Sequence, residues 1–215
     1  MTRIVFILVL CFSCLCGQAQ FSRDTAYRQI KKLQSEGVDT IIRYGKIVPM
    51  YGWIEQSKQL GEIVVQEYTF VFYQTKGETY LMRFMTYSDS AGIMGRTAVS
   101  KPMKVDAELM LKWAADNITT IIKQPICSHI IKQKPDGVNT VYDIYYPSHT
   151  EGINIGVLVG KEQVGHDFTF EDCQYNYSDN GPENLNYSYN IQTSTYKLYL
   201  ILQAITQSVQ NELKY

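Results

Sequence analysis

The stretch Tyr68–Tyr87, YTFVFYQTKGETYLMRFMTY, decides how this chain folds. Two runs rich in aromatic and β-branched residues flank the polar break Thr75-Lys76-Gly77-Glu78, and a short break with glycine between two such runs predicts a β-hairpin. On each predicted strand, three large side chains share one face: Tyr68, Phe70 and Phe72 on the first, and Tyr80, Met82 and Phe84 on the second. A lone hairpin is marginal in water, so further strands or a helix must cover these faces.

A first helix is predicted over Ser22–Glu36, with Ser22 as its N-cap and Gly37 as its stop. Lys31 and Lys32 lie near its C-terminal end, where positive charge suits the helix dipole. Its apolar residues fall on one face, namely Ala26, Ile30 and Leu33.

Two later segments also keep helical spacing. Asp106 is predicted to cap a helix that runs to Lys123 and ends before Pro125. The last segment, Ser194–Leu213, predicts a helix with an apolar stripe made of Leu198, Leu202, Ile205, Val209 and Leu213.

The remaining segments read as strands. They are Asp39–Val48, a hairpin from His129 to Tyr146 around Pro135-Asp136-Gly137, the alternating run Ile153–Val159, a strand with Phe168 and Phe170, and a hairpin that pairs Tyr175 and Tyr177 with Tyr187 and Tyr189. This order of elements predicts an α+β fold, in which an antiparallel sheet built from hairpins carries about three packed helices.

The start of the chain predicts a secretory signal peptide over residues 1–19, followed by a single α+β domain over residues 20–215. Arg3 is followed by the apolar run Ile4–Cys16, which is too short to span a bilayer. Small residues in Gly17-Gln18-Ala19 then predict cleavage before Gln20. The protein is therefore expected to be exported to the periplasm or medium.

A lipoprotein signal, with Cys14 or Cys16 as the acylated residue, is the alternative to simple cleavage. In either case no later apolar run is long enough to cross a membrane. The formal net charge is −1 and no basic stripe is present, so nucleic acid is not an expected partner.

Only Cys127 and Cys173 lie outside the predicted signal, and two cysteines in an exported domain predict one disulfide. Two alternatives stay open. The thiols can be unpaired and buried, or Cys127 can act as a nucleophile or zinc ligand, with His129 or His166 as its neighbour.

Other polar residues are weaker candidates for chemistry. His149 and His166 have the side chain of a general base, with Asp143, Asp167 or Glu171 to orient it. The segment Asp179–Asn184, with Asp172 and Asn176 nearby, is rich in the oxygen ligands that calcium prefers, but turn formation explains the same residues. No catalytic residue, metal ligand or cofactor is predicted.

Tyrosine is frequent, with 17 copies against 2 tryptophans. Aromatic side chains with a polar tip suit protein or glycan surfaces, so the ligand-binding candidates are Tyr175, Tyr177, Tyr187 and Tyr189. The resulting hypothesis is an exported, non-enzymatic protein that binds a protein or a cell-envelope ligand, and a toxin-neutralising module would be one such protein. A small hydrolase that uses Cys127 or His166 and a structural envelope component are the alternatives.

Overall fold

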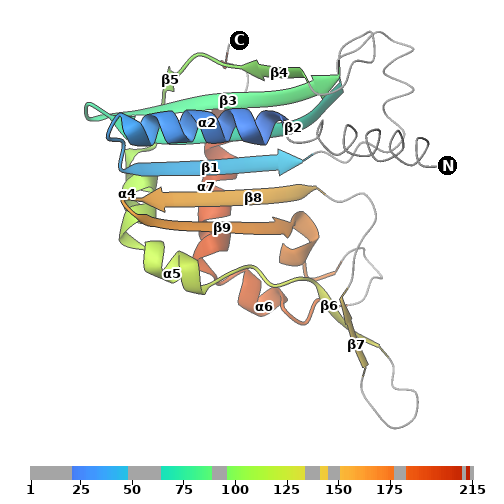
Figure 1. Ribbon diagram of the computed structural model, residues 1–215. Helices are drawn as coiled ribbons and strands as arrows, with labels where there is room; N and C mark the ends of the chain where they lie inside the picture. The colour runs from blue at the N-terminus through green and yellow to red at the C-terminus, as the bar shows by residue number, and fades with distance from the viewer. Residues whose placement is uncertain are drawn as a thin grey trace, which may run out of the picture.

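The computed structural model shows the predicted α+β class (Figure 1). Its described residues form a seven-stranded antiparallel sheet, a two-stranded sheet and five α-helices. The structure describes residues 21–47, 64–88, 96–133, 141–144, 151–176, 183–209 and 212–213.

The predicted hairpin is confirmed and lies in the large sheet. Strand β2 (Val64–Thr75) pairs antiparallel with β3 (Glu78–Ser88), and Thr75 lies opposite Glu78 across a two-residue turn. Lys76 and Gly77 in that turn have positive φ of 52° and 76°, which is the geometry that matches the twist of the two strands.

The remaining strands extend the hairpin on both sides, in the order β4-β3-β2-β1-β8-β9, and β5 also pairs with β3. Every pairing in the sheet is antiparallel. The added strands are β1 (Thr40–Ile47), β4 (Arg96–Val99), β5 (Met103–Lys104), β8 (Gly152–Val159) and β9 (Glu162–Thr169).

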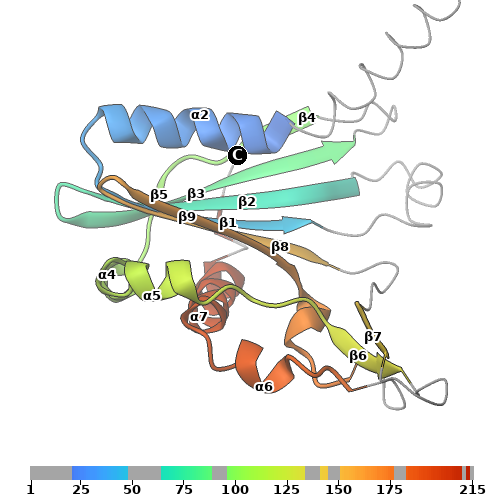
Figure 2. The ribbon, with the colours of Figure 1, turned by 60° about the horizontal axis from the view of Figure 1, so that its bottom comes forward.

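Helix α2 (Phe21–Ser35) covers one face of the sheet, over β2 and β3 (Figures 1 and 2). Ala26 and Leu33 of the helix are buried as predicted, in a cluster with Val71 and Phe84 of the sheet. Gly37 follows the helix with φ of +85°, a conformation that favours glycine, so the predicted stop is also confirmed.

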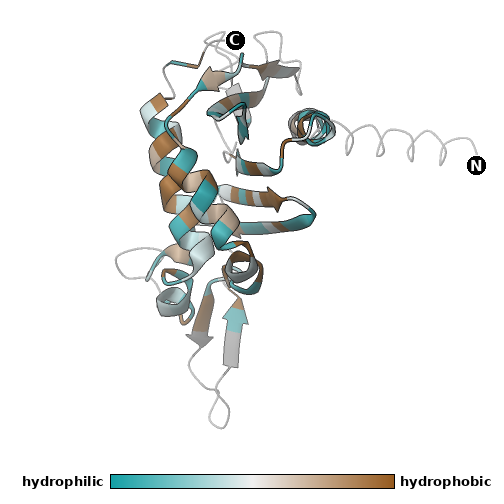
Figure 3. Cartoon of the chain, turned by 90° about the vertical axis from the view of Figure 1, so that its left-hand side faces the viewer, coloured by the Kyte–Doolittle hydropathy of each residue, from teal (hydrophilic) through white to brown (hydrophobic). Residues whose placement is uncertain are grey.

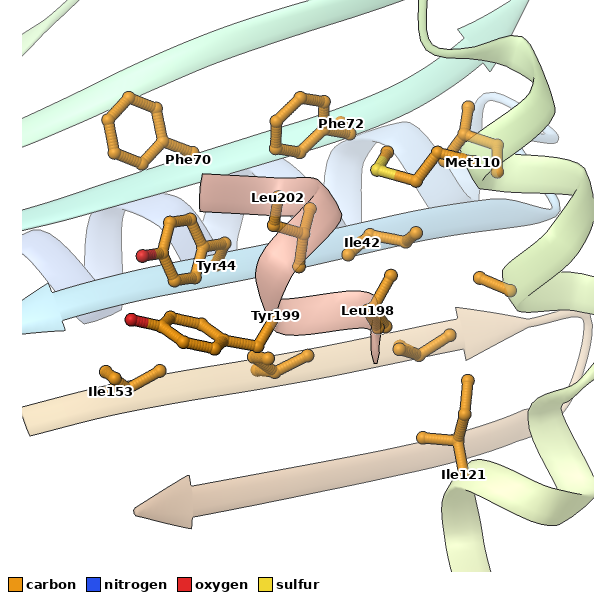
Figure 4. Packing of buried hydrophobic residues seen from close by; sticks show 14 of the residues in the cluster. Ile42, Tyr44, Phe70, Phe72, Met110, Ile121, Ile153, Leu198, Tyr199 and Leu202 are labelled. Carbon is orange, nitrogen blue, oxygen red and sulfur yellow. The ribbon is translucent and has the colours of Figure 1, made fainter. Parts of the chain in front are cut away.

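The opposite face carries a thicker layer of helices, α4 (Glu108–Asp116), α5 (Ile118–Lys123) and α7 (Ser194–Val209) (Figure 2). Figure 3 shows the sheet between this layer and α2. In Figure 4, Leu198 and Leu202 of α7 lie over Ile42, Tyr44 and Phe72 of the sheet, and all five side chains are buried.

One predicted helix is two helices. The helix expected from Asp106 to Lys123 breaks at Asn117, whose side-chain Nδ2 donates to the Trp113 carbonyl oxygen at 2.8 Å and closes α4. The N-cap residue is Ala107, not Asp106, and it makes no side-chain capping bond. The prediction missed the break because apolar spacing continues through Ile118 and Ile121.

The remaining described residues form shorter elements. Strands β6 (Ile130–Gln133) and β7 (Val141–Ile144) pair as predicted, and the turn at Pro135-Asp136-Gly137 lies outside the described residues. The predicted strand through Phe170 ends at Thr169, where a 3-10 turn (Phe170–Cys173) begins. No helix in the described part of the chain is long and apolar enough to span a bilayer.

Candidate functional site

A groove of about 110 Å³ lies beside α2, where the helix meets the part of the sheet formed by β1, β8 and β9. Along the helix it runs from Tyr27 to Gln34, which is about 10 Å at 1.5 Å per residue. Figure 1 shows why there is space: α2 lies over the β2–β3 side and leaves β8 and β9 uncovered on this face.

Two glycines form the floor of the groove. Arg43 of β1 pairs with Gly156 of β8, which in turn pairs with Gly165 of β9, so the three residues form one row across the sheet. A Cβ on Gly156 would lie 3.4 Å from Nε and 3.6 Å from Nη2 of Arg43, so the guanidinium lies across this glycine. A Cβ on Gly165 would meet no atom within 4 Å. Because Gly156 has no side chain, the Arg43 guanidinium can lie over it. The absence of a side chain at Gly165 leaves an open notch beside the guanidinium.

The groove has a positive lining. Lys31 of α2 and Arg43 of β1 both line it, and Nζ of Lys31 lies 5.2 Å from the ring centre of Tyr27 in a cation–π contact. Gln34 and Gln163 add amide groups. Among the described residues that line the groove, none is a carboxylate, a histidine or a cysteine. This chemistry suits the binding of an anion.

One acidic side chain on this face of the sheet, Asp167, is hydrogen-bonded. Asp167 lies two residues after Gly165 on β9, so it faces the same way. Its Oδ1 accepts a 2.6 Å hydrogen bond from Nδ2 of Asn154, its partner across β8 and β9.

The predicted disulfide is not formed: Cys127 and Cys173 are free thiols. Hydrogen bonds join the two segments instead, because the Asn190 side chain accepts from the Cys127 backbone N–H at 2.9 Å and donates to the carbonyl oxygens of Cys127 and Asp172, each at 2.7 Å. Burial, with a smaller contribution from Asp172, raises the pKa of the Cys173 thiol to about 12. Cys173 is therefore protonated at neutral pH and does not suit nucleophilic chemistry.

The Tyr-rich hairpin prediction is wrong in its second strand. Tyr187 and Tyr189 lie in the short helix α6 (Tyr187–Asn190), while Tyr177 lies outside the described residues. Tyr175 still meets Tyr187, ring to ring at 5.5 Å, and its hydroxyl donates to Glu183. Tyr175 and Tyr189 are 48% and 45% exposed, so this group forms a surface and lines none of the hollows described here.

His166 and Asp172 hydrogen-bond within the fold, and His129 is buried. The His166 ring is buried, and its Nε2 donates to the Ile121 carbonyl oxygen at 2.8 Å, which joins β9 to α5. His129 is fully buried, and His149 and residues 177–182 lie outside the described residues. Asp172 accepts from the backbone N–H groups of His129 and Thr169, each at 2.7 Å. Within the described ranges no group of His, Cys, Asp or Glu could hold a metal.

A second hollow, of about 90 Å³, lies on the other face of the sheet near α7. Tyr44 lines it, and its ring centre lies 6.0 Å from that of Phe70 and 6.2 Å from that of Tyr199 (Figure 4). Lys46 and Glu151, which also line it, form an ion pair at 2.6 Å. Burial raises the pKa of both tyrosines above the ordinary value of 10, so they stay protonated. The two charges of this hollow are therefore paired with each other.

Sequence reasoning missed the groove residues. The sequence pattern places Lys31 at the C-terminal end of the helix dipole and indicates no role for Arg43, Gly156 or Gly165. A signal existed, because glycine inside a predicted strand often marks a close approach or a bulge. Comparison with models of protein families, with curated proteins and with solved structures gives no match.

Proposed function

We propose that this chain is an exported, non-enzymatic binding protein of the cell envelope, and that the groove between α2 and strands β8 and β9 holds its ligand. The observation that carries the proposal is the lining of the groove. It combines two cationic side chains, Lys31 and Arg43, with an open notch at Gly165, and none of the described lining residues is a histidine, a cysteine or a carboxylate.

Export rests on the signal-peptide pattern of residues 1–19. N-terminal sequencing of protein recovered from the periplasm or medium is expected to begin at or near Gln20. An intact Met1 on cytosolic protein would contradict export, and an acylated cysteine would establish the lipoprotein alternative.

The binding role is tested on protein purified under native conditions from its own cell envelope. Native mass spectrometry is expected to show a stoichiometric bound mass, whether a small molecule or a protein. Gly165→Val fills the notch, and because no neighbour lies within 4 Å of the added Cβ, the variant is expected to fold and to lose that mass.

Leu109→Ala is the control, because Leu109 is 81% exposed on α4, in the layer on the other side of the sheet. The control variant should keep the bound mass. An empty wild-type protein, or a bound mass that survives Gly165→Val unchanged, would contradict the groove as the binding site.

A further inference from the structure

We propose that the hollow near α7 is a second binding site, which takes a neutral polyhydroxylated ligand, either a free polyol or the end of a glycan chain. The hollow lies on the face of the sheet that carries α7, whereas the groove described above lies on the face that carries α2. The proposal therefore concerns a different site and does not depend on the function argued for the groove.

A buried hydroxyl group without a partner lies beside this hollow. The Tyr199 side chain is 1% exposed, and its hydroxyl makes no hydrogen bond within the described part of the chain. Burial of such a group is unfavourable unless water or a ligand supplies the missing partner. In Figure 4 the hydroxyl of Tyr199 points to the same side as that of Tyr44, which lines the hollow. A molecule in the hollow is therefore the expected partner.

The Glu151 carboxylate relates both hydroxyl groups to the hollow. Burial raises the pKa of Tyr44 and of Tyr199, and the charge of Glu151, which lines the hollow, adds to the rise in both. Both phenols stay protonated at neutral pH, so each can donate a hydrogen bond to a ligand oxygen. A ligand hydroxyl can accept such a bond and donate its own proton to Glu151, which a group that only accepts cannot do.

The charges of the hollow favour a neutral ligand. Lys46 and Glu151 are the charged residues among the described ones that line it, and they form an ion pair at 2.6 Å. An ionic ligand would compete with one member of this pair and be repelled by the other. A hydroxyl group can hydrogen-bond to either member without separating the pair.

An aromatic row and an amide-bearing helix line the rest of the hollow. The ring of Phe70 lies between those of Tyr44 and Tyr68, with ring centres 6.0 Å and 6.3 Å apart and planes inclined by 20° and 17°. Gln203 and Gln207 of α7 add amide groups. A polyol can cover aromatic carbon with its C–H groups while its hydroxyls bond to the amides. Water alone would leave the aromatic surface in contact with solvent.

The size of the hollow limits the ligand. A volume of about 90 Å³ is that of roughly three water molecules in the liquid, so a short polyol such as glycerol or one edge of a sugar ring can enter. A free polyol and the terminal unit of a glycan share this chemistry, and the experiment separates the two sources.

NMR titration of the purified full chain, labelled with ¹³C in its tyrosine rings, tests the proposal. The probes are glycerol, glucose and maltotriose, with propan-1-ol as the analogue of glycerol that lacks two hydroxyls and glucuronate as the charged analogue of glucose. Saturable shifts of the Tyr44 and Tyr199 ring signals are expected with glycerol or glucose, at an affinity at least about tenfold above that of the matching analogue. Tighter binding of maltotriose than of glucose and glycerol would assign the site to a glycan end, and any other order to a free polyol.

Three results would overturn the proposal. They are the absence of a saturable shift with glycerol, glucose and maltotriose, which would leave only water in the hollow; binding of propan-1-ol as tight as that of glycerol; and binding of glucuronate as tight as that of glucose.

Hydroxyl and amide variants locate the ligand. Tyr199→Phe removes the unpartnered hydroxyl and keeps the ring, so it is expected to fold, to be no less stable than wild type and to weaken binding by about three- to tenfold. Gln203→Leu should weaken binding to a similar extent.

Tyr80→Phe is the matched control, because the Tyr80 hydroxyl donates to Glu78 at 2.7 Å and its ring packs on the cluster at the α2 face. This variant and Gly165→Val, which fills the notch in the groove, should both keep the affinity for the polyol. Equal losses in Tyr199→Phe and Tyr80→Phe, or full affinity in both Tyr199→Phe and Gln203→Leu, would contradict the hollow as the site.

Discussion

The β2–β3 hairpin and the junction around Asp172 are both largely buried, but different forces hold them. The hairpin has a regular backbone ladder, and its buried side chains are apolar residues such as Phe72 and Phe84. At the junction the side chains of Asp172, Asn184 and Asn190 hydrogen-bond to backbone atoms, several of them distant in sequence. The first arrangement follows from alternation, while the second depends on where single amide and carboxylate groups meet distant backbone.

The largest effect is expected in the hairpin. Phe72→Ala should lower the free energy of unfolding by about 3–5 kcal/mol, because Phe72 is fully buried and its removal leaves a cavity. Denaturant unfolding followed by circular dichroism measures the loss. Leu109→Ala, on an exposed side chain, should change stability by less than about 0.5 kcal/mol. Similar losses in both variants would contradict the assigned core.

A large-to-small substitution in the helix layer that covers this hairpin should destabilise the protein almost as much. Leu202 is fully buried at the centre of the α7 stripe, so Leu202→Ala is expected to cost about 2–4 kcal/mol in the same unfolding experiment. A loss below about 0.5 kcal/mol would mean that the stripe does not pack on the sheet.

Substitutions at the junction should lower the free energy of unfolding by less. The loss should depend more on the hydrogen-bonding groups that are removed than on the volume that is removed. Asn190→Ala removes donors to two carbonyl oxygens and is expected to cost about 1–3 kcal/mol. Asn190→Asp keeps the volume of the side chain but places a carboxyl group against the same carbonyl oxygens. Those oxygens raise the pKa of the new carboxyl group in the folded state. Its cost is therefore present above pH about 4 and should shrink as the pH falls toward that value. An Asn190→Asp variant as stable as wild type at pH 7 would show that packing alone matters there.

Cys173, which lies in the same junction, should add a smaller pH dependence to the stability of the protein. Its pKa is raised from 9.0 to about 12, so the folded thiol stays protonated while the unfolded thiol ionises. This contribution to stability is fully present below pH 9 and is lost as the pH rises toward 12. The slope of unfolding free energy against pH above 9 should therefore be shallower in Cys173→Ala.

Alkylation of the reduced, folded protein at pH 8 checks the same thiol directly. Iodoacetamide should modify half-buried Cys127 well before buried Cys173. Equal rates for the two thiols would mean that Cys173 is accessible. Mass spectrometry of non-reduced peptides from exported protein would reveal a Cys127–Cys173 bond if one forms on oxidation.

The smallest effect is expected at the surface beside the junction. Tyr175→Phe removes the hydroxyl that donates to Glu183, but this pair is exposed to water. The unfolding midpoint should therefore stay within experimental error of the wild type. A loss comparable to that of Asn190→Ala would extend the junction to this tyrosine.

Much of the fold could be predicted because its signals are local. Alternation in Tyr68–Tyr87, the stop at Gly37 and the stripe around Leu202 each reflect one element and the face that it buries. The same reasoning failed at Tyr187 and Tyr189. Spacing of two residues is typical of a strand, but the segment forms a helical turn that brings the Asn190 amide to Cys127 and Asp172.

The groove could not be predicted because it is defined by register. Gly156 and Gly165 matter only because they are neighbours across β8 and β9, with Arg43 next in the row. Lys31 then joins them because of where α2 lies over the sheet. None of these relationships is present in the order of residues along a single element.

The uncovered part of the sheet beside α2 also affects how this protein can evolve. Exposed positions on β9, such as Gln163 and Gly165, line the groove and belong to neither buried cluster. Under the proposed binding role, substitutions there would alter what the groove accepts while leaving the packed layers on both sides intact, so stability and ligand preference could be selected separately. A lineage of such proteins would then diversify its ligands through a few edge residues on an unchanged scaffold.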